Sequence, residues 1–134
     1  MSSSERSISA ALSALVVLQL VMLFSLYAGV PPHPPASTPL FGIGPFIGAA
    51  ISAALASIIV GPLAGTSGRI LCGLAAILAL VSFGPQKYFD AQIGSIWPAV
   101  VAGQVAAVYS LTALSGRVHR RGANEKDAAG GEAR

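Results

Sequence analysis

Four long runs without a charged residue constrain this chain more than any other feature. They cover residues 8–30, 40–60, 70–83 and 96–114. A membrane core about 30 Å thick is crossed by about 20 helical residues, so the first, second and fourth runs are long enough to cross. Only 10% of the 134 residues are charged, against roughly a quarter in a soluble domain. The chain therefore cannot be an ordinary soluble globule, and we expect an integral membrane protein.

The third run is short. Its 14 residues, 70–83, give a helix of only about 21 Å. An extension back to residue 66 includes Arg69, whose long side chain can reach the lipid headgroups. We expect a full crossing over residues 66–83, with a re-entrant segment as the alternative. The predicted fold is all-α: one domain, residues 1–114, with four transmembrane helices at about 8–30, 40–60, 66–83 and 96–114.

The positive residues predict the orientation. With four crossings, seven of them share one side, whereas the other side holds only Lys87. Because Lys and Arg favour the cytoplasmic side, we expect both termini in the cytoplasm, in a bacterial inner membrane. The first run exceeds a usual signal-peptide core, so we expect it to remain uncleaved. The tail, residues 115–134, mixes Gly, Ala and both charge signs, which predicts disorder.

Small residues recur at four-residue steps, most clearly in the second and fourth runs. Such stripes let helix backbones approach closely, which is what holds helices together in lipid. Either they pack the chain's own bundle, or they form a face for self-association or for other membrane proteins. The residues are Gly44, Gly48, Ser52 and Ala56 in the second run, and Ala99, Gly103 and Ala107 in the fourth.

Two amides lie near the middle of the membrane. Gln19 is the centre of the first run and Gln104 is one residue from the centre of the fourth. A side-chain amide in hydrocarbon needs a hydrogen-bond partner. We expect each amide to hold its helix to a neighbouring helix by a hydrogen bond. The two amides are candidate hydrogen-bond partners of each other. The alternative is a polar point on a substrate path.

Aromatic side chains gather at the predicted outer helix ends. Seven of the nine lie there, among them Tyr27, Tyr88, Phe89 and Trp97. Aromatic belts normally serve both interfaces of a membrane protein. The one-sided distribution indicates either membrane anchoring or an outward docking platform centred on residues 84–90.

Residues that could carry chemistry are sparse. His33 and His119 fall on opposite predicted sides, so no set of metal ligands converges. No carboxylate pair, nucleophile triad or phosphate-binding loop occurs in a credible context. The net charge of +3 is spread beside apolar runs, not in a nucleic-acid-binding stripe. We expect no enzyme, cofactor or nucleic-acid partner.

In size and layout the chain resembles two families, the small multidrug antiporters and the small membrane subunits of tripartite solute transporters. The antiporter resemblance implies an intramembrane glutamate in the first helix, where this chain has Gln19. The segment Gly44-Pro45-Phe46 is similar to the transporter subunits, but their long polar central linker is missing. We assign no family from these features.

The function predicted from the sequence is therefore non-catalytic. The small-residue stripes and the one-sided aromatics favour an accessory or assembly subunit of a larger membrane complex. The alternative is a small membrane subunit of a solute transporter, or a homo-oligomeric pore lined by Gln19, Gln104 and the glycine faces.

Overall fold

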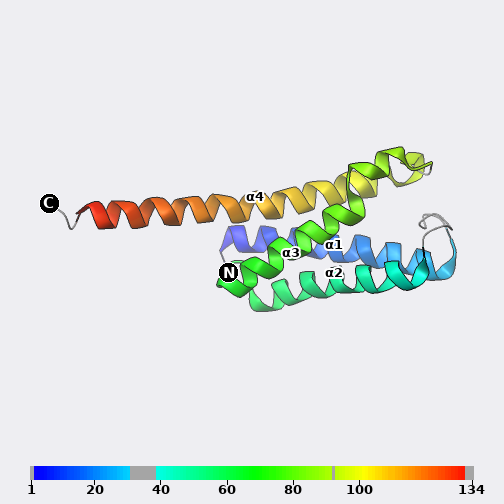
Figure 1. Cartoon of the computed structure of the whole chain (residues 1–134), viewed down its shortest axis with the longest axis horizontal. Helices are drawn as coiled ribbons and strands as arrows, with labels where there is room; N and C mark the ends of the chain where they lie inside the picture. The colour runs from blue at the N-terminus through cyan, green and yellow to red at the C-terminus, as the bar shows by residue number, and fades with distance from the viewer. Residues whose placement is uncertain (1, 31–38, 92, 132–134) are drawn as a thin grey trace.

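The computed structural model describes residues 2–30, 39–91 and 93–131, the side chains of Leu40 and of residues 117–131 excepted. The described part contains four α-helices, one short 3₁₀ helix and no strand (Figure 1). The elements are α1 (Ser3–Ala28), α2 (Leu40–Val60), α3 (Thr66–Phe83), η1 (Pro85–Phe89) and α4 (Ile93–Gly131). The all-helical prediction is confirmed.

All four helices are long and apolar enough to cross a membrane. The segments that meet this requirement are Ser3–Ala28, Phe41–Val60, Thr66–Phe89 and Ile93–Gly116. The third segment comprises α3 together with η1. These segments fit the four transmembrane helices predicted from the sequence.

Local capping groups decide where α1 begins and ends. The Ser2 hydroxyl accepts a hydrogen bond from the Glu5 backbone N–H at 3.2 Å, which satisfies a donor that the first turn leaves free. The helix therefore starts five residues before its uncharged run. At the other end Gly29 adopts a left-handed conformation with φ 65°, which glycine reaches without steric cost.

The helices form a bundle in which each helix packs against its neighbours in the chain, and α4 closes on α1. The direct contact between α1 and α3 is much smaller. In Figure 1, α1 and α2 run alongside each other, α3 crosses them obliquely, and α4 extends beyond the other helices.

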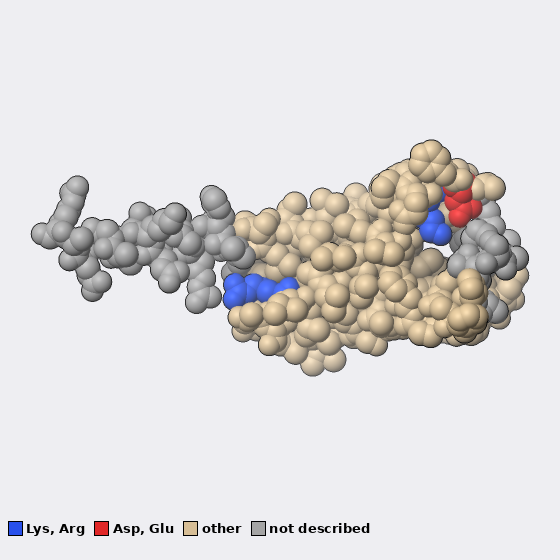
Figure 2. Space-filling view, in the orientation of Figure 1, with Lys and Arg blue, Asp and Glu red and all other residues tan. Residues whose placement is uncertain are grey.

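Isoleucine and leucine from α1, Ile47 from α2 and small residues from α2, α3 and α4 fill the core. The small side chains allow close helix packing where the hydrophobic effect provides no drive. Charged side chains lie at the two ends of the face drawn in Figure 2, and none crosses its middle. The core includes Ile8, Leu12, Leu15, Ile47, Ala50, Ala54, Cys72, Ala75, Ala76, Ala79 and Ala107.

The last helix includes most of the tail. α4 continues without a break to Gly131, whereas the sequence indicates disorder from residue 115. Alanine, arginine, glutamate and lysine all favour helix, and residues 117–129 are rich in them. Their helical preference continues a helix that the preceding apolar segment has already nucleated.

Candidate functional site

The small-residue stripe of α4 packs against other helices of the same chain. Ala107 is fully buried, and Gly103 lies directly against the ring of Phe83. A Cβ added at Gly103 would sit 2.8 Å from Phe83 Cγ and 3.1 Å from Phe83 Cβ. Ala99 is half-buried. This stripe therefore packs α4 against the end of α3.

The stripe of α2 is divided between two environments. Gly44 is buried beneath the Tyr27 hydroxyl, but a Cβ at Gly48 would meet no atom within 4 Å. Ser52 is exposed, and its hydroxyl donates to the Gly48 carbonyl at 2.8 Å. Ala56 is half-buried. We call Gly48, Ser52 and Ala56 the open face of α2, because no other helix of the described chain covers it fully.

Gln104 joins three elements. Its Nε2 donates to the Phe83 carbonyl at 2.8 Å, and its Oε1 accepts from the Tyr88 hydroxyl at 3.0 Å. The Phe83 carbonyl belongs to the last residue of α3, where helical carbonyls lack a partner in their own helix. Through these two bonds the Gln104 side chain connects α4 to the end of α3 and to η1.

Removal of the Gln104 amide should loosen η1. We expect Gln104→Leu to raise hydrogen–deuterium exchange at the Lys87 and Asp90 amides, whose η1 hydrogen bonds measure 3.0 and 3.1 Å. The free energy of unfolding should fall by about 0.6–2 kcal/mol. Tyr88→Phe removes one of the two bonds and should give a smaller change. Equal exchange in Gln104→Leu and the parent chain would contradict this role.

Gln19 is buried but does not pair with Gln104. Its side chain is 1% exposed, and among the described residues neither Oε1 nor Nε2 has a hydrogen-bond partner. The suggested pairing of the two amides is therefore absent from this structure, because Gln104 bonds to Phe83 and Tyr88.

The aromatic residues that the sequence places at the outer helix ends lie at one end of the bundle, which we call the aromatic end. It comprises the end of α1, the start of α2, η1 and the start of α4 (Figure 1). Tyr27 is 68% exposed, Phe89 91% and Trp97 55%. Tyr88 is also exposed, but its hydroxyl is engaged by Gln104. Beside them Lys87 and Asp90 form an ion pair at 3.9 Å.

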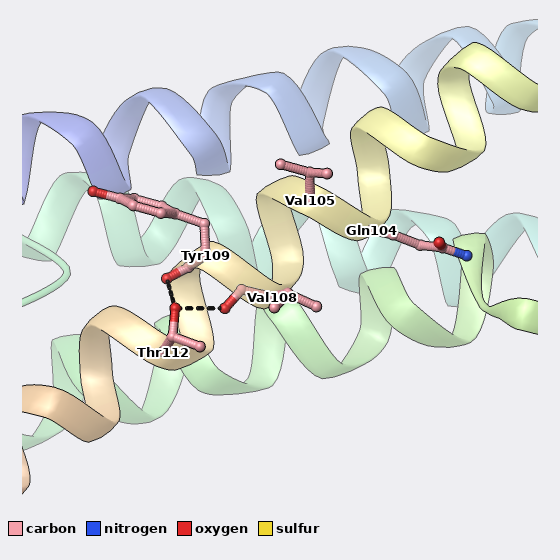
Figure 3. Close-up of a pocket in the computed structure, with 5 residues that line it drawn as sticks. All are labelled: Gln104, Val105, Val108, Tyr109 and Thr112. Atoms are coloured by element: carbon pink, nitrogen blue, oxygen red, sulfur yellow. Dashed lines mark hydrogen bonds between the residues drawn. The ribbon is translucent and has the colours of Figure 1, made fainter.

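A shallow hollow follows the outer side of α4 (Figure 3). It encloses about 370 Å³ and is lined by Gln104, Val105, Val108, Tyr109 and Thr112. The Thr112 hydroxyl bonds back to the carbonyls of Val108 and Tyr109, each at 3.0 Å. With its lining mainly apolar, the hollow suits a hydrocarbon surface. The hollow is not among the sites predicted from the sequence, although valines at positions 101, 105 and 108 form an outward apolar strip.

Metal-binding side chains do not gather in the described part of the chain: no group of three His, Cys, Asp or Glu residues lies together there. His33 and the side chain of His119, both considered from the sequence, fall outside what the structure describes. No family model, curated protein or solved structure matches this chain.

Proposed function

We propose that this chain is a non-catalytic integral membrane protein that serves as an accessory or assembly subunit of a larger membrane complex. The observation that carries the proposal is the open face of α2. In the stripe of α4, Gly103 packs against Phe83 within the chain. In α2, by contrast, a Cβ at Gly48 would meet no atom within 4 Å, and Ser52 is exposed. The two stripes thus have different roles.

The proposed occupant of the open face is a transmembrane helix of a partner protein. Small side chains let two helix backbones approach until van der Waals packing and weak Cα–H···O contacts become effective. A lipid chain gains little from such a flat strip, because lipid is as apolar as any helix surface. The Ser52 hydroxyl adds a polar group that a partner helix can engage.

The orientation follows from charge in the same proposal. Both termini lie in the cytoplasm of a bacterial cell, with the protein in the inner membrane and the aromatic end outward. Seven of the eight Lys and Arg residues fall on the cytoplasmic side in this arrangement. The exposed aromatics then stand at the outer interface, where tyrosine and tryptophan favour the headgroup region.

A second candidate function is a subunit of a solute transporter or a homo-oligomeric pore. The unpaired Gln19 amide favours it, because polar groups inside a membrane bundle often mark a path for solutes. The other buried residues of α1 are all apolar, which is why we place this function second.

Purification from native membranes in mild detergent tests the first proposal. We expect Ser52→Leu to abolish stoichiometric recovery of partner proteins, because the larger side chain prevents close approach. Ser13→Leu is the matched control: Ser13 is also exposed, and its hydroxyl also bonds back one turn, to the Ser9 carbonyl at 2.8 Å. Mass spectrometry of the co-purified proteins gives the readout.

Either of two results would contradict the proposal. Recovery of the parent chain alone, as a homo-oligomer, would favour the pore. Equal loss of partners in Ser52→Leu and Ser13→Leu would show that the open face of α2 is not the contact.

A further inference from the structure

Gln19 belongs to the buried side of α1. It follows Leu12, Leu15 and Val16 at helical spacing, and all four side chains are buried. Only 1% of the Gln19 side chain is exposed. The amide therefore points into the bundle and not toward lipid or the headgroups.

The Gln19 amide has bonding capacity that the described chain does not use. It offers two N–H donors and a carbonyl acceptor, and neither atom has a partner among the described residues. Burial of an amide without hydrogen bonds is strongly unfavourable, and such groups in native proteins are normally satisfied by protein or by ordered water.

The Ser9 hydroxyl oxygen is also buried without a partner, but it lies ten residues before Gln19 on α1, about 15 Å away along the helix axis. The three other polar side chains that are buried in the described part are already engaged. Each is a serine whose hydroxyl donates to a backbone carbonyl, and the Gln104 amide uses both of its atoms as well. The pairs are Ser57 to Gly68, Ser82 to Leu78 and Ser110 to Ala106. None of these groups is left to serve Gln19.

The chemistry around Gln19 fits a neutral ligand. The nearest charged residues on α1 are Glu5 and Arg6, about 20 Å away along the helix axis. A neutral amide cannot balance the charge of an ion in an apolar core. A water molecule both donates and accepts, so it complements the two halves of the amide.

We propose that the Gln19 amide binds an internal water molecule in the core of the bundle. The site is a single hydrated point, separate from the open face of α2 and from the hydrogen bonds of Gln104. This water site does not depend on the presence of a partner protein.

Hydroxyl-radical footprinting by X-ray radiolysis of the full chain in detergent tests this site. A bound water produces radicals in place, and Met22 lies one turn from Gln19 on the same side of α1. Met22 is partly buried against the core. We expect Met22 to be oxidised in the parent chain, and this oxidation to be lost in Gln19→Leu. Gln104→Leu is the matched control and should leave it unchanged.

A second measurement needs only the parent chain. A radical scavenger in the bulk solution should suppress modification of Phe89, which is 91% exposed, and should spare Met22. The proposal is overturned if Met22 stays unmodified, if the scavenger suppresses Met22 as strongly as Phe89, or if Gln19→Leu leaves Met22 oxidation unchanged.

Discussion

Replacement of Gly103 by alanine should destabilise the bundle, although alanine is the better helix former. The added Cβ would lie 2.8 Å from Phe83 Cγ and 2.9 Å from Phe83 Cδ2. Phe83 is only 5% exposed, so its ring cannot swing away without disturbing other core side chains. We expect a loss of about 1–3 kcal/mol in the free energy of unfolding, measured by denaturant titration in detergent micelles.

Gly48→Ala is the matched control for this change. It also places alanine inside a helix, but its Cβ meets no atom within 4 Å. We expect it to gain about 0.5–1 kcal/mol from helix propensity. In addition, Phe83→Leu should partly restore the stability of Gly103→Ala, because the two side chains are in direct contact. Equal stabilities of Gly103→Ala and Gly48→Ala would show that α3 and α4 do not meet at this point.

Replacement of Gly68 by alanine should have an effect at least as large. A Cβ at this position would overlap the Gly61 carbonyl oxygen, which is backbone and cannot rotate away. Gly61 has φ 91°, a conformation that other residues rarely adopt, so the turn has little freedom to move. The Ser57 hydroxyl bond to the Gly68 carbonyl, 3.3 Å long, would be disturbed too.

We expect Gly68→Ala to cost about 3 kcal/mol, the upper part of the range for overpacking. Gly73→Ala is its control in the same helix, because that Cβ would make only an ordinary contact, 3.9 Å from a Leu114 methyl group. Thermal unfolding in detergent should give a lower Tm for Gly68→Ala and an unchanged or higher Tm for Gly73→Ala. A Tm for Gly68→Ala at or above the parent value would refute the close approach of α3 to the turn.

The helices themselves could be predicted because their signal is local. Uncharged runs ending at Gly61-Pro62 or before Gly84-Pro85 mark helix ends that the structure reproduces in α2 and α3. The end of α4 could not be predicted in this way. The tail has no apolar stripe, and its helical state depends on the helix that precedes it.

The residues of the candidate site could be named from the sequence, but the atoms that they contact could not. Small residues at four-residue steps indicate close packing, yet Gly48 and Gly103 are equivalent in this pattern. Only the structure separates them, since one faces open space and the other faces Phe83. The hydrogen-bond partners of Gln104 could not be predicted for a similar reason. One of them is the Phe83 backbone carbonyl, and a residue of any type supplies such a carbonyl.

The sequence by itself determined that the chain has four helices able to cross a membrane, because length and absence of charge are properties of each segment alone. The tertiary structure decided which faces of those helices are covered, because coverage depends on how helices distant in sequence are rotated and placed beside one another. That rotation buries Gln19, engages Gln104 with Tyr88, and leaves the open face of α2 only partly covered.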